Sequence, residues 1–221
     1  MNKDRPAANY AHQMELFNPA CAKPIIVIGV GSIGGYVVDF LAKMGVSDIT
    51  VMDHDSVASH NSPMSIYRPQ DVGRHKVDVL KEIVYDHSGI SIKTFREEYT
   101  NQKLDQFNAV IVCVDEMAVR KAIWDQVKGN IKISVHIDTR TSGAYGEIIS
   151  TSPFTQTEQA DYEKLLYSDE EASIQTCGMH GVIYASVGVA AGVTGNIAQH
   201  WQNGNKKPRD ARRYDLLKSI F

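Results

Sequence analysis

The feature that most constrains the fold is an apolar, strand-like run that leads directly into a glycine-rich loop and a helical pattern. The run is IIVIGV at residues 25–30, and the loop GVGSIG occupies residues 29–34. Apolar side chains then recur at three- and four-residue spacing, at Tyr36, Val37, Phe40, Leu41 and Met44. Such a β-branched run is typical of a parallel strand covered on both faces. Glycines at the start of a helix let backbone N–H groups approach a phosphate, so the segment predicts a phosphate-binding unit.

A second apolar run, Ile49–Met52, completes a βαβ unit and ends in the acidic triplet Asp53-His54-Asp55. Asp53 follows Gly34 by nineteen residues, a position from which a carboxylate accepts hydrogen bonds from the ribose of a nucleotide. The loop and the acid together predict nucleotide binding. The alternative is a glycine turn with a structural role only. The loop alone does not choose between nucleotides, and NAD is the default ligand of such a unit.

The remaining periodicity alternates between strands and helices. It predicts strands at 91–95, 109–114, 131–137 and 145–151, and helices at 77–87, 118–127, 162–167 and 181–201. The strands at 131–137 and 145–151 are expected to begin an antiparallel edge. We therefore expect a single α/β domain at residues 25–221, with a doubly wound, mostly parallel Rossmann-like sheet. Residues 1–24 are expected to form an N-terminal arm.

Composition excludes several classes of protein. The formal net charge of −3 implies no general attraction to nucleic acid or to anionic membranes. The three cysteines are far apart and form no CxxC pair, so a thiolate zinc site is not expected and free thiols fit the cytoplasm. The longest apolar stretch, 181–198, contains polar residues and predicts a packed core helix, not a membrane span.

A long polar stretch, HNSPMSIYRPQDVGRHK at His60–Lys76, separates the acidic triplet from the next helix. An NAD enzyme has no use for a lysine that returns toward the phosphates. An enzyme that cleaves a triphosphate needs cations over the β- and γ-phosphates and a carboxylate for magnesium. Asp115 follows the apolar run AVIVCV, and the carboxyl ends of parallel strands open on one crevice. The sequence therefore favours ATP over NAD.

Four segments occur in the order and near the spacing of one family: GVGSIGG, ITVMDHDSVASHN, DVGRHK and VIVCVDEMAVR. With CGMHGVIYASVGVAAGVTGNIA further on, the chain from about Asn9 to Trp201 resembles the ThiF/MoeB/HesA superfamily of ubiquitin-activating-enzyme-like adenylyltransferases. The resemblance implies a homodimer that uses ATP and Mg²⁺ to adenylate the C-terminal glycine of a ubiquitin-like or sulfur-carrier protein.

The resemblance also implies roles for individual residues. Asp53, beside Asp55, would hold the ribose, Asn61 and Lys76 would lie around the phosphates, and Asp115 would bind magnesium. The nucleotide would lie against four residues of the loop, Gly29, Gly31, Ser32 and Gly34.

Two arginines of the family pattern are replaced in this chain. Met64 stands where an arginine after the asparagine is usual, and His12 stands where an N-terminal arginine reaches across the dimer. The loss of two guanidinium groups weakens a triphosphate site unless other arginines substitute. The candidates are Arg68, Arg74 and Arg140, and we favour Arg140 because it follows a strand on the crevice side.

Cys177 is a candidate nucleophile for a thioester, because His180 is near in sequence and a helix N-terminus follows. Burial without a chemical role is the alternative, since cysteine is commonly buried. Cys113 lies inside an apolar run and is expected in the core. Arg120 follows Glu116 by four residues and predicts a surface ion pair, although the resemblance also allows it to border the nucleotide.

Three functions remain for the whole chain. Adenylation of a carboxylate is the first, with Lys76, Asp115, Arg140 and Cys177 as its catalytic residues. A catalytically weakened nucleotide-binding scaffold or sensor of the same fold is the second. An NAD(P)-dependent oxidoreductase is the third, and it is disfavoured because the sequence has no catalytic Tyr-x-x-x-Lys pair and no clear substrate domain.

Overall fold

In a computed structural model of the chain, residues 8–60, 62–167, 182–204 and 212–215 are described. The strands are β1 (Ile25–Ile28), β2 (Ile49–Met52), β3 (Lys93–Phe95), β4 (Ala109–Val112), β5 (Val135–Ser142), β6 (Tyr145–Thr151) and β7 (Arg212–Asp215). The helices are α1 (Gly34–Lys43), α2 (Lys76–Ser88), α3 (Met117–Val127), α4 (Gln156–Glu163) and α6 (Ile183–Gln202). Four short 3₁₀ helices accompany them: η1 (Ala11–Gln13), η2 (Pro19–Cys21), η3 (Ser62–Met64) and η4 (Pro69–Asp71).

The strands form one sheet in the order β3-β2-β1-β4-β5-β6-β7. β1 is central and pairs in parallel with β2 and β4, while β4 pairs in parallel with β5. The pairs β5–β6 and β6–β7 are antiparallel. From β1 the chain first adds β2 and β3 on one side, and then crosses back to add β4 and the later strands on the other side. This confirms the predicted doubly wound, mostly parallel sheet with an antiparallel edge.

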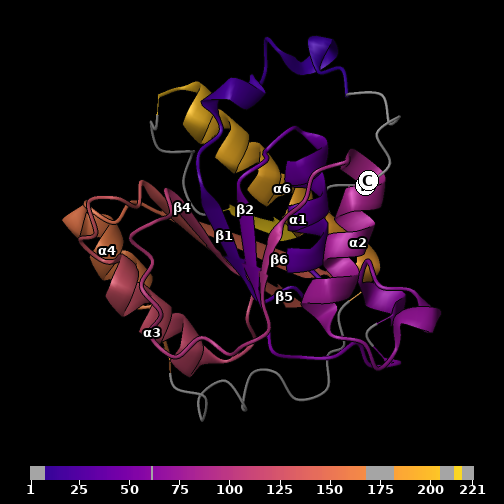
Figure 1. Ribbon diagram of the computed structural model, residues 1–221. Coiled ribbons are helices and arrows are strands. Elements are labelled where there is room, and N and C mark those ends of the chain that lie inside the picture. The colour runs from indigo at the N-terminus through magenta and orange to yellow at the C-terminus, as the bar shows by residue number, and fades with distance from the viewer. Residues whose placement is uncertain (1–7, 61, 168–181, 205–211, 216–221) are drawn as a thin grey trace.

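Helices cover both faces of the sheet, so that every residue of β1 and β4 is buried. In Figure 1, α1, α2 and α6 lie on one side of the sheet, and α3 and α4 lie on the other. One core cluster contains side chains of α1, α2 and α6, and a second contains Trp124 of α3 and Tyr162 of α4. Within the part of the chain that the structure describes, no helix is long and apolar enough to cross a membrane.

Two elements have boundaries that differ from the predicted ones. The strand predicted at 131–137 is β5, which begins at Val135 because β4 offers its first paired residue, Ala109, only there. Ile131 therefore remains 86% exposed despite the alternating apolar pattern. The helix predicted at 162–167 is α4, which ends at Glu163, so Leu165 and Leu166 pack against the core just beyond it.

The described part of the N-terminal arm packs against the sheet domain. Phe17 is buried in the first core cluster and its ring stacks on that of Trp201, with centroids 6.5 Å apart. The Gln13 side chain donates to the carbonyl oxygen of Met44 at 2.7 Å. The arm is thus fixed near the ends of α1 and α6.

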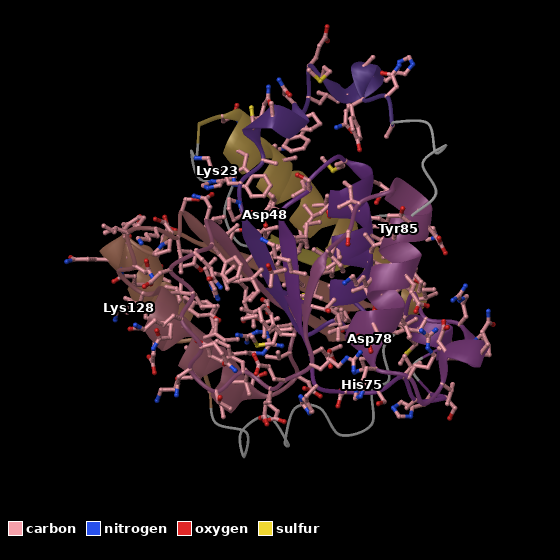
Figure 2. All side chains as sticks on the ribbon, viewed as in Figure 1. Lys23, Asp48, His75, Asp78, Tyr85 and Lys128 are labelled. Atoms are coloured by element: carbon pink, nitrogen blue, oxygen red, sulfur yellow. The ribbon has the colours of Figure 1, made fainter. Side chains whose placement is uncertain are left out.

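The carboxyl ends of the parallel strands lie together at one edge of the sheet. Figure 2 shows Lys23 and Asp48, which precede β1 and β2, at the opposite end of the strands from His75, which precedes α2. The glycine loop, the acidic triplet and the start of α2 are therefore neighbours, and ligands of such sheets bind at this edge.

Candidate functional site

The glycine loop connects β1 to α1, and two of its glycines are required by packing. Gly29 has φ +84°, and a Cβ there would lie 2.6 Å from the carbonyl oxygen of Cys113. A Cβ on Gly34 would lie 2.0 Å from the carbonyl oxygen of Gly29. Gly31 differs, because a Cβ there would meet nothing within 4 Å. Gly31 lines a crevice. The fold therefore does not require a glycine at this position, but the absence of a side chain leaves space for a ligand.

Asp53, at the tip of β2, holds the loop in place. Its Oδ2 accepts a hydrogen bond from the backbone N–H of Val30 at 2.8 Å, and its Oδ1 accepts one from the N–H of Asp55 at 2.8 Å. The Lys76 Nζ lies 3.9 Å from Asp53 Oδ1 and donates to Asp55 Oδ2 at 2.6 Å. The structure thus brings together the loop, the acidic triplet and Lys76, as the sequence predicted.

Lys76 is only 7% exposed and is the first residue of α2. Partial burial raises the pKa of the Asp55 carboxyl, but the hydrogen bond and the charge of Lys76, together with His54, outweigh burial and lower that pKa. Asp53, His54 and Asp55 lie close enough to hold a metal ion. The lysine ammonium already balances these carboxylates, however, and a divalent ion would have to displace it.

The polar stretch leaves the strand tip and returns to it. Ser56 and His75 form an antiparallel bridge, and the Lys76 N–H donates to the carbonyl oxygen of Asp55 at 3.0 Å. In between, the buried Tyr67 hydroxyl donates to the carbonyl oxygen of Val30 at 2.6 Å. The stretch therefore supports the glycine loop from behind and places Lys76 in front of it. Sequence reasoning missed Tyr67, whose only signal is one aromatic residue in a polar segment.

Two of the candidate arginines pair with acids that do not line the crevice. Arg68 donates to Asp71 at 3.0 Å through Nε, and Arg74 pairs with Glu82 at 2.5 Å. Neither belongs to the residues that line the crevice. Met64 ends η3 and is half-buried. Asn61 and Cys177 lie outside the described residues.

The crevice in front of the loop has two adjoining lobes. The first has a volume of about 240 Å³. Its lining includes Gly29, Gly31, Ser32, Asp53, Asp55, Lys76 and Asp115, the apolar Ile28, Met52, Tyr99 and Val119, and the further acids Glu97, Glu98 and Glu116. The second has a volume of about 380 Å³ and is lined by Ser32, Asp115, Arg120, Arg140 and Tyr167, among others. Asp115 is exposed and lines both lobes. The carboxylate predicted to hold a metal thus lies where the two lobes meet.

A buried charge cluster forms the wall behind the second lobe. Asp138 of β5 is 0% exposed and accepts hydrogen bonds from Arg120, from Arg140 at 2.9 Å and from the Tyr162 hydroxyl at 3.1 Å. Arg120 also donates to the carbonyl oxygens of Val114 and Thr139. The predicted surface ion pair of Arg120 is therefore wrong: its side chain turns inward to Asp138.

Three buried titratable groups near this cluster, Tyr162, Cys113 and His136, are electrically neutral near pH 7. Burial raises the pKa of the Tyr162 hydroxyl to about 12 and that of the Cys113 thiol to about 11. Burial, aided by the charge of Arg120, lowers the pKa of His136 to about 3. Cys113 packs against the core, as predicted, but it also lines both lobes. Its raised pKa makes this thiol a poor nucleophile.

Comparison with known proteins places this geometry in a family. The family model described as ThiF family matches residues 16–220. The ATP-dependent ubiquitin transferase-like protein Cap2 of Enterobacter hormaechei subsp. hoffmannii (strain UCI 50) is 26% identical over 153 residues, which are 65% of this chain and 26% of that protein. Ubiquitin-like modifier-activating enzyme 5 of Caenorhabditis briggsae is 23% identical over 117 residues, 46% of this chain and 27% of that protein. The chain thus spans about a quarter of the length of these curated relatives.

Solved structures agree on the fold. The crystal structure of PaaA superposes with a TM-score of 0.72 at 16% identity, over 98% of this chain and 84% of that one. E. coli MccB, in its structure with AMPCPP and MccA, gives a TM-score of 0.67 at 14% identity, over 86% of this chain and 59% of that one. Because the family model covers nearly the whole chain, this protein belongs to the ThiF family.

Proposed function

We propose that this protein uses ATP to adenylate a carboxylate, with release of pyrophosphate. The observation that carries the proposal is the position of Lys76, whose ammonium lies in the same lobe as the glycine loop and the tip of β2. A cation buried beside a phosphate-binding loop serves a polyphosphate, whose charge it offsets in the transition state. A dinucleotide-dependent hydride transfer has no need of it.

The first lobe suits a purine nucleotide. Met52, Tyr99 and Val119 offer apolar surface for a base. Asp53 is the residue for the ribose, as its relation to the loop implies. The backbone N–H groups at the start of α1, together with Lys76, are the groups for the phosphates. Displacement of pyrophosphate then depends mainly on positioning, because the carboxylate of the acceptor is itself the nucleophile.

The residues present also fit a magnesium ion bound with the nucleotide. Asp115 supplies a carboxylate oxygen at the junction of the lobes, and within the described ranges no basic side chain pairs with it. Magnesium prefers such oxygen ligands and completes its shell with phosphates and water. When bound, the ion would offset charge on the phosphates. Asp55 is less suited, because Lys76 already pairs with it.

The acceptor is inferred from relatives to be a protein tail that ends in glycine. Relatives carry names such as ubiquitin-like modifier-activating enzyme 5 and, at 28% identity over 107 residues, adenylyltransferase and sulfurtransferase UBA4 of Lodderomyces elongisporus. The first name refers to a ubiquitin-like modifier, and the second to adenylyl transfer and sulfur transfer. We therefore propose a small ubiquitin-like or sulfur-carrier protein as the partner.

One observation favours a second function, a nucleotide-binding scaffold or sensor without adenylation activity. None of Arg68, Arg74 and Arg140 is among the residues that line the first lobe in the described part of the chain. The triphosphate would then face Lys76 and a helix N-terminus without an arginine. ATP binding is common to both functions, so only a measurement of adenylation can distinguish them.

ATP with magnesium is expected to raise the melting temperature of the protein, whereas NAD is not. A ligand at a hundredfold excess over its Kd stabilises the native state by about 2.7 kcal/mol. A thermal-shift series with ATP, ADP, NAD and NADP measures this. Gly31→Ala is the matched control. A methyl group there meets no other atom of the protein within 4 Å, so the variant without ligand should melt at the wild-type temperature. Because the methyl group occupies ligand space, ATP should no longer raise that melting temperature. A response to NAD alone would overturn the proposal.

We also propose that the protein is a homodimer. Val182, Ile183 and Tyr184, at the start of α6, are exposed large apolar side chains on consecutive residues. Such groups are commonly covered by a partner surface. Sedimentation equilibrium at micromolar concentration is expected to give twice the chain mass, and a mass near 24.5 kDa would contradict the dimer.

A further inference from the structure

The second lobe is lined by an arginine whose guanidinium is fixed by its neighbours. Arg140 donates from Nε and Nη2 to Asp138 Oδ2, at 3.2 and 2.9 Å, and from Nη1 to the carbonyl oxygen of Leu165 at 3.1 Å. These bonds use three of the five N–H donors of a guanidinium, and Arg140 also hydrogen-bonds the Tyr162 side chain. A guanidinium held in this way is a fixed cation, and charged hydrogen-bond donors of this kind bind carboxylates strongly. The side chain is 15% exposed and lines the lobe.

The charge of this wall also favours an anion. The single carboxylate of Asp138 lies between two guanidinium groups, Arg120 and Arg140. Tyr162, Cys113 and His136 are neutral near pH 7, because their pKa values are about 12, about 11 and about 3. One positive charge therefore remains on the described part of the wall.

Two other acids lie near this wall. Glu147 is opposite Arg140 in the β5–β6 pair and engages in interactions of its own, but it does not line the lobe. Asp115 lines the lobe and is the carboxylate that we have assigned to magnesium. Arg140 thus lines the same lobe as Asp115.

We propose that the second lobe binds the terminal carboxylate of the acceptor and that Arg140 is the residue that holds it. This inference rests on the proposed adenylation. The two lobes share Ser32, Cys113, Val114 and Asp115, so an anion on Arg140 lies beside the nucleotide. A carboxylate oxygen must approach the α-phosphate although both groups are negative, and a fixed cation lowers that repulsion. Arg140 is therefore assigned to the acceptor and not to the triphosphate.

The shape of the lobe agrees with a tail that ends in glycine. Its lining includes the short hydroxyl side chains of Ser32, Thr139 and Thr141 beside the Tyr167 ring. The Arg140 guanidinium lies 5.6 Å from the centre of that ring, and Asp138 holds its other side. A guanidinium fixed in this way loses little freedom when it binds a carboxylate. Its positive charge selects a carboxylate over an amide, because an amide brings no charge.

The test uses two synthetic peptides with the same sequence ending in Gly-Gly, one with a free carboxylate and one with a C-terminal amide. Each is titrated calorimetrically into the full chain saturated with AMPCPP and magnesium. The wild type is expected to bind the carboxylate peptide about tenfold or more tightly than the amide. Arg140→Gln is expected to bind both peptides equally weakly, and Arg140→Lys to keep part of the difference. Arg68→Gln is the matched control, since that arginine lies outside the crevice.

The outcomes separate this inference from the proposed function. Affinity for AMPCPP is expected to stay within about twofold in Arg140→Gln, because the residue does not line the first lobe. A large loss of AMPCPP affinity in that variant would assign Arg140 to the phosphates and overturn the inference. Retained discrimination in Arg140→Gln, or no discrimination by the wild type, would also overturn it. No binding of AMPCPP to the wild type would instead overturn the proposed function. Thermal unfolding of each variant verifies that the protein stays folded when Asp138 loses its bond to Arg140.

Discussion

Asp115→Asn is expected to reduce ATP–pyrophosphate exchange by about a hundredfold or more while leaving the protein folded. Asp115 is exposed at the end of β4, where a neutral isostere disturbs no packing. Surface changes of this kind alter the free energy of unfolding by about 0.5 kcal/mol or less. The loss should come from weaker binding of the magnesium that accompanies the phosphates. Exchange is measured with an accepted carrier protein, and unfolding is followed by circular dichroism.

The matched control is Asp125→Asn, the same substitution on an exposed acid of α3 that lines neither lobe. It is expected to exchange at the wild-type rate. A second measurement locates the effect: ATP affinity in EDTA should be equal in Asp115→Asn and the wild type, whereas affinity with magnesium should differ. Wild-type exchange by Asp115→Asn would remove this carboxylate from the reaction.

His136→Leu is expected to make the protein much less sensitive to acid. His136 is 0% exposed and lies between the rings of Trp124 and Tyr162, at centroid distances of 5.2 and 4.9 Å. Among the residues that the structure describes, neither ring nitrogen has a hydrogen-bond partner. Its pKa is lowered to about 3 by burial and by the charge of Arg120. The folded protein therefore holds this histidine neutral.

The sign follows from which state binds the proton. In the unfolded chain the pKa of histidine is about 6.5, so below that pH the unfolded state takes up a proton that the folded state excludes. Stability is complete above pH ~6.5 and falls by about 1.4 kcal/mol per pH unit down to the folded pKa. Near pH 4.5 the loss from this residue is about 2.7 kcal/mol. His136→Leu lacks the titrating imidazole, so this loss of stability in acid does not occur in the variant.

Denaturant unfolding between pH ~7 and ~4.5 measures this difference. The lowered pKa values of Asp55, Asp71 and Glu163 also reduce stability in acid, but those groups are common to both proteins and cancel in the comparison. Near pH 7 the variant should be at least as stable as the wild type, because an unpaired buried polar group costs about 1–3 kcal/mol. His12→Gln, at an exposed position, is the control. Equal acid sensitivity of His136→Leu and the wild type would show that this histidine is not held neutral.

The parts of the fold that the sequence predicted are those with local signals. The loop at Gly29–Gly34 follows a β-branched run and begins a helix, so its role is visible within ten residues. The partnership of Asp53 with the loop and of Lys76 with the strand tip was expected from the topology of parallel sheets. Those side chains converge as expected, with Lys76 bonded to Asp55 at 2.6 Å.

The second lobe could not be predicted, because its residues meet only through packing. Asp138, Arg120 and Tyr162 come from β5, α3 and α4, and no spacing in the sequence relates them. In the sequence, Asp138 is a single acid in a segment of mixed polar and apolar residues. Its burial between Arg120 and Arg140 arises only when β5 pairs with β4. The boundary of β5 was misplaced for the same reason: alternation of apolar residues continues to Ile131, but the neighbouring strand does not.

Tyr67 and Lys76 show how one segment can have a structural and a chemical role at once. The stretch His60–Lys76 was predicted to be the wall of a polyphosphate site. Its Tyr67 hydroxyl holds the glycine loop at Val30, and its last residue presents the ammonium. A buried tyrosine that donates to a backbone carbonyl leaves no mark in hydrophobic periodicity, so this support is visible only in the folded structure.

The most direct test of the central claim is ATP–pyrophosphate exchange with purified small ubiquitin-fold proteins that end in Gly-Gly. Each is assayed beside a copy that lacks the terminal glycine. We expect magnesium-dependent exchange with at least one intact carrier, none with its truncated copy, and an AMP adduct on the carrier by intact-mass measurement. If the protein binds ATP but supports no exchange with any intact carrier, it is a nucleotide-binding scaffold, and the adenylation proposed here is contradicted.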